Sequence, residues 1–296
     1  MNNSSIPQYP LFSPISMEMK EDIDSLLLKL PDGLSEFTFL NLYLFRKIYS
    51  YTLSKYKDML IIKGSYKKIP FFITPCYVLE QEIIRKELNE GLKWSHISSS
   101  FLEQNNKTLP KDLKIEEDRD NFDYVYLRES LAKLEGKELH KKKTHINKFE
   151  KTYTNIEIKE LTKNNIMEAF QVLEEWKIGQ KSIADYNEAK EALTLLSDGF
   201  SLKGILLYVE KKPIAWTLAE VLEEKKTAIV LFEKALSSCK GSFQYVNYAF
   251  ASSLDEKIEY INREQDLGDE GLRQAKMTYR PIKFIKKYMV KAPCNN

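Results

Sequence analysis

A dense set of charged residues follows a predicted strand near the C-terminus. An alternating strand pattern ends at Asn262, and Arg263, Glu264 and Asp266 come next, before a predicted helix over residues 269–276. Carboxylates at such a position can remove protons, and cationic side chains can stabilise a developing oxyanion. The alternative is a solvated loop whose internal ion pairs are worth about 0–1 kcal/mol each.

The helix after this segment adds two cations. Arg273 and Lys276 are three residues apart, so they share a helix face and are expected to form a positive edge. Together with Asn262 and Arg263 they are candidate substrate-binding residues. Tyr279, shortly after the helix, is either a general acid or an anchoring side chain at a helix end.

Glu233 lies near the end of a predicted strand over residues 227–234, and a neighbouring strand is predicted over 257–262. We expect Glu233, Glu264 and Asp266 to converge as candidate catalytic carboxylates. Like-charge repulsion would raise a carboxylate pKa there and create a base, whereas nearby cations would lower it. The alternative is that Glu233 is an exposed edge residue paired with Lys234.

A helix predicted over residues 241–254 contributes Asn247, which either faces substrate or hydrogen-bonds to a neighbouring loop. Lys240 and Gly241 stand just before it. A helix start of this kind can hold an anion such as the pyrophosphate of coenzyme A, although a single glycine is not the usual phosphate cradle. A coenzyme A thioester is therefore one candidate cofactor.

Composition indicates a globular chain. The sequence has 296 residues, a formal net charge of +2, 10 glycines and 10 prolines, so overall charge gives no reason to expect a polyanion partner. Three cysteines without a Cys-x-x-Cys spacing indicate neither zinc nor disulfides, and they favour a reducing compartment. Because there is no export signal and no apolar run of membrane-spanning length, we expect a cytoplasmic protein, with peripheral membrane contact left open.

Helical and strand patterns alternate twice along the chain. They predict an α/β protein of two similar domains, residues 1–155 and 156–296, with a helical region over 127–151 between them that is kinked or broken at Gly136. The second pass reads strand, two helices, three antiparallel strands, helix, strand, helix and strand. A hairpin is predicted around residues 64–67 of the first pass.

The connecting helical region contains many lysines, which offer contacts to tRNA phosphates. The alternative is a solvated helix partly balanced by glutamates. His140 and His145 are spaced by five and have no third ligand nearby, so no metal site is predicted. The lysines are Lys133, Lys137, Lys141, Lys142, Lys143, Lys148 and Lys151.

The element order resembles the GNAT acyltransferase fold, and several motifs together resemble the family of the C-terminal domain of phosphatidylglycerol lysyltransferase over nearly the whole chain. The motifs are Asp123-Tyr124-Val125-Tyr126, Gly136-Lys137-Glu138-Leu139-His140-Lys141-Lys142-Lys143, Asn147-Lys148-Phe149, the 263–276 segment and Tyr279-x-Pro281. The resemblance implies tandem GNAT-like domains. It also implies transfer of an aminoacyl group from a charged tRNA to phosphatidylglycerol.

The sequence departs from that family at three points. A second lysine of the family's Lys-x-Lys-Phe-x-Pro segment is absent after Lys276, Lys143-Thr144 replaces a frequent Arg-Asn pair, and the relatives' membrane domain has no counterpart. A soluble acceptor is therefore as open as a lipid. Three functions remain: an aminoacyl-tRNA-dependent transferase acting on an amine or hydroxyl, an acetyl-coenzyme-A-dependent N-acyltransferase, and a non-catalytic binding module.

Overall fold

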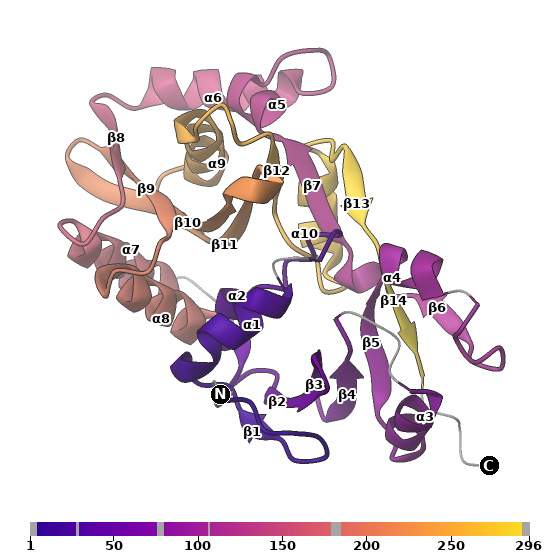
Figure 1. Cartoon of the computed structure of the whole chain (residues 1–296). Helices are drawn as coiled ribbons and strands as arrows, with labels where there is room; N and C mark the ends of the chain where they lie inside the picture. The colour runs from indigo at the N-terminus through magenta and orange to yellow at the C-terminus, as the bar shows by residue number, and fades with distance from the viewer. Residues whose placement is uncertain (1–4, 28–29, 76–79, 106, 179–184, 292–296) are drawn as a thin grey trace. The chain divides into compact units, whose positions relative to one another are not determined.

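The computed structural model describes residues 5–27, 30–75, 80–105, 107–178 and 185–291. It divides into two compact units. Unit 1 comprises residues up to Asp123 together with Gln265–Asp269 and the C-terminal segment from Ile285, and unit 2 comprises Tyr124–Glu264 and Glu270–Phe284. Each unit is built on one mixed seven-stranded sheet (Figure 1).

Unit 1 covers its sheet with four α-helices: α1 (Lys20–Leu27), α2 (Phe39–Phe45), α3 (Gln81–Asn89) and α4 (Ser99–Asn105). The strand order is β1 (Ser13–Pro14), β2 (Thr52–Tyr56), β3 (Met59–Tyr66), β4 (Ile69–Ile73), β5 (Lys93–Ser98), β14 (Lys287–Val290) and β6 (Ile115–Glu117).

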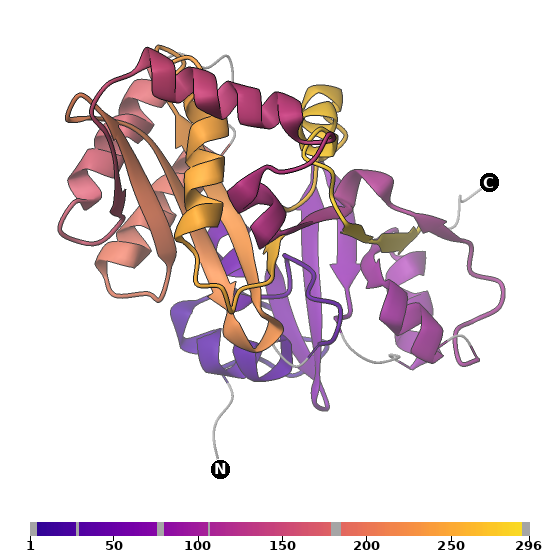
Figure 2. The same ribbon diagram turned by 90° about the horizontal axis from the view of Figure 1, so that it is seen from above.

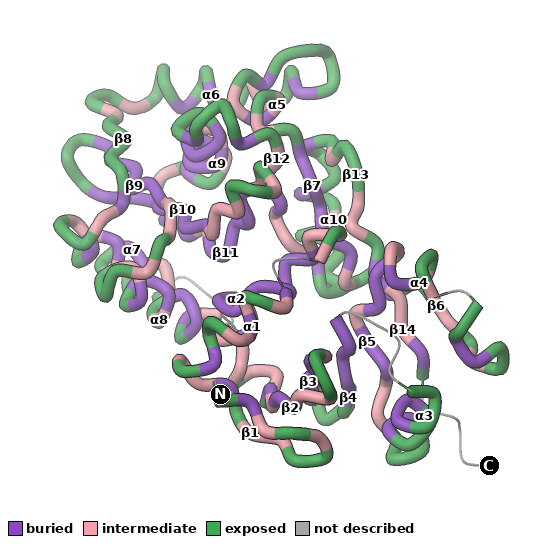
Figure 3. Tube along the Cα trace, in the orientation of Figure 1, coloured by how far each residue is buried: buried purple, intermediate pink, exposed green. Residues whose placement is uncertain are grey.

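In unit 2 the strand order is β13 (Lys283–Ile285), β7 (Asp123–Leu127), β12 (Tyr260–Asn262), β11 (Thr227–Ala235), β10 (Lys212–Leu222), β9 (Lys203–Val209) and β8 (Ile156–Glu160). Its helices are α5 (Arg128–Lys133), α6 (His140–Thr152), α7 (Ile166–Ile178), α8 (Tyr186–Ser197), α9 (Ser242–Ser253) and α10 (Glu270–Met277). Helices α7 and α9 both pack on β10 and β11, and the strands between them are largely buried (Figure 3).

The two units repeat one topology. Strands β2, β3 and β4 are antiparallel, and α3 leads to β5, which pairs parallel to β4; strands β9, β10 and β11 are antiparallel, and α9 leads to β12, which pairs parallel to β11. The predicted fold class, α/β with two GNAT-like halves, is thereby confirmed. The central pair expected in the second half is β11 and β12.

Each sheet is completed by a strand from a distant part of the sequence. Strand β14, at the C-terminus, pairs with β5 and β6, while β7 pairs antiparallel with β12. The compact units consequently divide the chain near residue 123, not at residue 155. Residues 124–152 belong to unit 2 because β7 bonds to β12 and because α5 and α6 pack on α9.

One local expectation is confirmed and one needs correction. The helical region predicted over 127–151 is broken near Gly136 as expected: a strand end is followed by the separate helices α5 and α6, because Leu134 and Gly136 adopt positive φ. The first-half hairpin turns at Lys67 and Lys68, both of positive φ, and Gly64 lies inside β3. Two consecutive positive φ values are typical of a tight two-residue hairpin turn.

Candidate functional site

The candidate site lies where β11 and β12 separate. Their parallel pairing covers only three residue pairs and ends at Ile229 and Asn262. Strand β11 continues to Ala235 without β12 beside it, so Glu233 stands four residues past the last pair. The ends of parallel strands in α/β proteins are common ligand sites, because strand ends leave backbone groups and side chains free to face a ligand.

Glu233 forms an ion pair with Arg263, which directly follows β12. The Arg263 guanidinium lies 3.2 Å from Glu233 Oε1, and the two side chains are only 15% and 12% exposed. Asn247 of α9 donates a hydrogen bond of 3.3 Å from Nδ2 to Glu233 Oε2. Burial opposes the charge of Arg263, but Glu233 raises its pKa above the ordinary value. Three predicted site residues are therefore brought together, with Glu233 next to a cation.

Two buried polar atoms beside this ion pair have no hydrogen-bond partner among the described residues: Asn247 Oδ1 and Thr217 Oγ1. Thr217 of β10 is directly opposite Glu233 in the sheet register, so both side chains lie on one face. Thr217 is fully buried and Asn247 is 4% exposed. Since an unpaired buried polar atom costs about 1–3 kcal/mol, these atoms are suited to bonding a ligand.

Tyr279 completes the cluster. Its ring lies under two cations, with Lys142 Nζ at 3.9 Å and the Arg263 guanidinium carbon at 5.3 Å from the ring centroid. Burial raises the pKa of the Tyr279 phenol to about 12. Burial and the neighbouring Arg263 lower the pKa of the Lys142 ammonium. We call Thr217, Glu233, Asn247, Arg263 and Tyr279, with Lys142, the Glu233 site.

Other predicted residues shape the backbone at the strand end. Asn262 is fully buried and its Oδ1 accepts a hydrogen bond from the Glu264 amide, which fixes a tight turn. Lys276 is 7% exposed and donates from Nζ to the backbone carbonyls of Arg263 at 2.6 Å and Glu264 at 3.1 Å. The ammonium of Lys276 thereby positions Arg263, while Arg273 lies one helical turn earlier on α10.

Asp266 belongs to unit 1. It is fully buried, lies 3.3 Å from the Arg119 guanidinium, and accepts a hydrogen bond of 2.9 Å from the Gly268 amide. These contacts fix a turn at Gly268, whose φ is 79°. A catalytic role for Asp266 or Glu264 stays a prediction.

Lys240 and Gly241 lie at the start of α9. Gly241 is the N-cap with φ of 96°, a left-handed conformation that favours glycine, and a Cβ there would lie 3.3 Å from the Phe149 ring. Lys240 is exposed. The helix start thus offers backbone N–H groups and one lysine to an anion.

The arrangement suits acyl transfer. A carboxylate can accept a proton from an attacking amine or hydroxyl, and Arg263 and Lys142 can stabilise negative charge on the carbonyl oxygen. A phenol with a pKa near 12 is protonated at neutral pH, so Tyr279 can donate to a leaving group. The site thus contains a candidate base, Glu233, candidate oxyanion stabilisers, Arg263 and Lys142, and a candidate acid, Tyr279.

Sequence reasoning missed Thr217, and it placed Lys142 in the basic stretch instead of at the site. The available signal for Thr217 was a polar residue inside the apolar strand 214–222. In unit 1 it also missed a buried cluster, in which Lys287 Nζ contacts Glu36 at 2.5 Å and Asp123 at 2.7 Å while His96 Nε2 lies 3.3 Å from Glu36. These residues are far apart in the sequence, and no local pattern joins them.

Comparison with known proteins gives the relatives. A protein of unknown function from Bacteroides thetaiotaomicron has a similar structure, with a TM-score of 0.83, 29% identity and coverage of 95% of this chain and 99% of that one. The L-PGS of Bacillus licheniformis shares the fold at 13% identity, with a TM-score of 0.61 and coverage of 93% and 92%. An uncharacterised protein of Mycoplasmoides gallisepticum is 29% identical over 193 residues, which are 61% of this chain and 58% of that protein's length.

A family model for the C-terminal region of phosphatidylglycerol lysyltransferase matches residues 29–291, which is most of the sequence. In the part of the chain that the structure describes, no helix is long and apolar enough to cross a membrane. The chain belongs to the family of phosphatidylglycerol lysyltransferase C-terminal domains.

Proposed function

We propose that the protein transfers an aminoacyl group from a charged tRNA to an amine or hydroxyl acceptor, with the Glu233 site as its centre. The observation that supports this most is the Glu233–Arg263 pair at the separation of β11 and β12. It is flanked by two buried oxygens, Thr217 Oγ1 and Asn247 Oδ1, that have no hydrogen-bond partner among the described residues. In this scheme Glu233 removes the acceptor's proton and Arg263 stabilises the oxyanion. Tyr279 protonates the departing ribose oxygen.

Helix α6 supports tRNA as the donor. Lys141, Lys148 and Lys151 are exposed and are spaced by seven and three, so they form one stripe along the helix. Among the described residues no carboxylate forms an ion pair with any of the three. Figure 2 shows α6 running across α9, the helix that contributes Asn247. A stripe of free cations suits successive phosphates.

The family name supports a lipid as the first acceptor to test. Phosphatidylglycerol has a terminal glycerol hydroxyl, which fits the acceptor chemistry of a carboxylate base. Lysyl-tRNA and phosphatidylglycerol vesicles are therefore the first substrates to try, with a soluble amine or hydroxyl acceptor as the second choice.

The test supplies the purified protein with radiolabelled lysyl-tRNA and phosphatidylglycerol vesicles, and in parallel with radiolabelled acetyl-coenzyme A and the same acceptor. We expect label in the lipid fraction from lysyl-tRNA alone. Label from acetyl-coenzyme A alone would replace this proposal with a coenzyme-A-dependent acyltransferase, for which Lys240 and Gly241 at the start of α9 are the candidate phosphate contacts. If neither donor transfers label to the lipid or to soluble acceptors, the remaining function is that of a non-catalytic binding module.

A further inference from the structure

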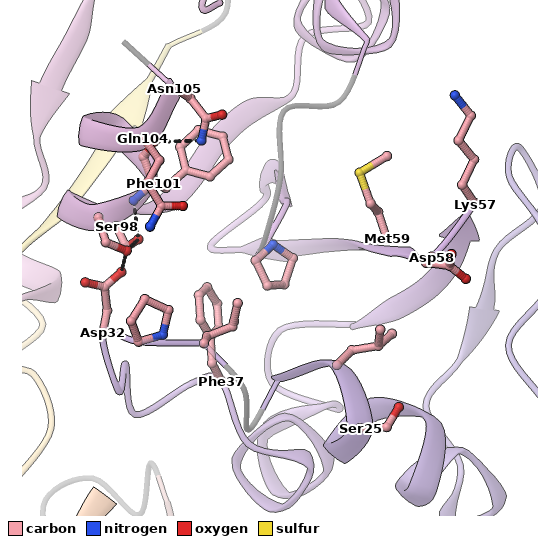
Figure 4. A pocket seen from close by; sticks show the side chains of 15 residues that line it. Ser25, Asp32, Phe37, Lys57, Asp58, Met59, Ser98, Phe101, Gln104 and Asn105 are labelled. Atoms are coloured by element: carbon pink, nitrogen blue, oxygen red, sulfur yellow. Dashed lines mark hydrogen bonds between the residues drawn. The ribbon is translucent and has the colours of Figure 1, made fainter.

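Unit 1 contains a cavity that the proposed function does not use. Its volume is about 570 Å³, within the range of about 300–1,000 Å³ that is typical of small-molecule sites. The cavity lies beyond the short parallel pair of unit 1, because Pro75 follows β4 and Ser98 ends β5. Helices α1 and α4 and the turn between β2 and β3 supply the other walls (Figure 4).

The walls of this cavity are largely apolar. Phe37 and Phe101 are each 4% exposed, and Leu26, Leu30 and Met59 line the same space. Aromatic and thioether side chains pack well against a flat or flexible apolar body. The cavity therefore suits a ligand with an aromatic or alkyl portion.

One side of the cavity is polar. Ser100 Oγ donates a short hydrogen bond to Asp32 Oδ2, and Ser98 Oγ lies 3.4 Å from Ser100 Oγ. Asp32 Oδ1 takes no hydrogen bond from the residues that the structure describes. Figure 4 shows Asp32, Ser98 and Phe101 on one side of the cavity and Met59 on the other. Asp32 thus places a carboxylate at one side of the cavity, where a cationic donor can bind.

The charge around the cavity is negative. Asp32, Asp58 and Lys57 are the ionisable lining residues, and Lys57 Nζ is paired with Glu80 at 2.9 Å. Behind the wall, Ser98 is directly opposite Lys287 in the sheet. The buried carboxylates there, Glu36 and Asp123, are paired with Lys287 and His96. The excess of carboxylates among the lining residues favours a cation over an anion.

We propose that this cavity is a second ligand site, for a small molecule that joins an apolar body to a protonated amine. The apolar body lies between Phe37, Phe101 and Met59, and the ammonium pairs with the Asp32 carboxylate. The cavity shares no lining residue with the Glu233 site and its ligand does not depend on the transferase proposal, so failure of either leaves the other standing.

A matched pair of probes tests the site. Phenethylamine and 3-phenylpropanoate have similar bodies and opposite charges. Each is titrated into the full chain carrying ¹³C-methyl methionine, with the Met59 signal assigned through Met59→Leu. We expect phenethylamine to shift the Met59 signal and to bind at least tenfold more tightly than 3-phenylpropanoate. No shift of Met59 by phenethylamine, or equal affinity for the two probes, would overturn the proposal.

Two asparagine variants locate the counter-ion. Asp32→Asn keeps the shape and a hydrogen-bond partner for Ser100 but removes the charge, so the preference for the amine should disappear. Asp58→Asn, the same change on the other side of the cavity, should alter the affinity less than twofold. A preference that survives in Asp32→Asn would overturn the assignment of Asp32. If Asp32→Asn does not fold, Ser100→Ala keeps the carboxylate and must retain the preference; its loss there counts against the site.

Discussion

The proposed role of Tyr279 is to donate its phenol proton to the leaving group. Tyr279→Phe keeps the ring under Lys142 and Arg263 and removes only the phenol. Because the buried phenol is a donor at neutral pH, we expect transfer to fall about 100-fold, in the range of general acid catalysis, with little change in melting temperature. Transfer rates and melting curves of the variant check this.

Tyr248→Phe is the matched control, because Tyr248 also lies under a lysine, Lys143 at 5.5 Å. Its transfer rate should equal that of the wild type. If both variants lose the same fraction of the transfer rate, a general effect on α6 and α9 explains the loss and acid catalysis by Tyr279 is contradicted.

Glu36 makes unit 1 sensitive to acid. Burial alone would raise its pKa, but Lys287 and His96 hold the pKa well below the ordinary value. A depressed carboxylate pKa stabilises the fold above the unfolded-state value of about 4.3, and this stability is lost as pH falls below it. Urea unfolding at a series of pH values should therefore show falling stability from about pH 5 downward.

Glu36→Gln should flatten that acid dependence and lower stability at pH 7, because Lys287 and His96 lose a buried carboxylate partner while Lys287 keeps its pair with Asp123. The exposed Glu129→Gln, which loses only its pair with Lys133 on α5, is the control. An acid dependence in Glu36→Gln that matches the wild type would contradict the assignment.

Helix α6 is predicted to bind tRNA through its exposed stripe. Replacing Lys141 and Lys148 with Gln removes two phosphate contacts, so the slope of log affinity against log salt should decrease by about 2. Fluorescence anisotropy with tRNA at several salt concentrations measures the slope.

Lys190→Gln with Lys203→Gln removes the same charge from lysines that are paired with Glu174 and Glu160 and lie outside the lysine-rich stretch. The slope of this control should remain at the wild-type value. A control slope that falls as far as that of the α6 variant would reduce the effect to net charge.

The elements of unit 2 could be predicted well because their signals are local. The separate strands 203–209, 212–222 and 227–235 are largely apolar runs divided by polar turns. Glu233 and Arg263 were each expected near the end of a strand, but the predicted convergence there was of Glu233 with Glu264 and Asp266, and the Glu233–Arg263 ion pair was not predicted. Thr217 reaches the site only through cross-strand register with Glu233, which depends on a bulge between Leu218 and Ala219. A bulge of one residue has no clear signal in one sequence.

At the scale of the whole molecule, the sequence did not predict that β14 would complete the sheet of unit 1 and β7 that of unit 2. Strand β14 pairs with β5 across almost two hundred residues, and the favourable pairing energy that selects it is a sum of long-range contacts. The ion pairs of the buried Lys287 depend on this placement of β14, since its partners Glu36 and Asp123 come from the first half of the chain. Local sequence patterns therefore predicted that the C-terminal strand belongs to the second domain.

Because β14 completes the sheet of unit 1, a substitution in this C-terminal strand should affect strands that are distant in the sequence. Lys287→Met leaves two buried carboxylates without their cation, so amide hydrogen exchange should accelerate in β5, over residues 93–98, and in β4. Exchange in β9 and β10 of unit 2 should remain at the wild-type rate. Protection lost equally in both sheets, or only near residue 287, would contradict this description of the units.

The central claim, that the Glu233 site performs acyl transfer, is tested most directly by single-turnover transfer from lysyl-tRNA with Glu233→Gln. The amide keeps the shape and the Asn247 contact but cannot accept the acceptor's proton, so we predict a rate at least tenfold lower, equivalent to about 1.4 kcal/mol or more, with a similar melting temperature. Glu259→Gln, which loses only an exposed pair with Lys226, should transfer at the wild-type rate. A wild-type rate in Glu233→Gln would contradict the account.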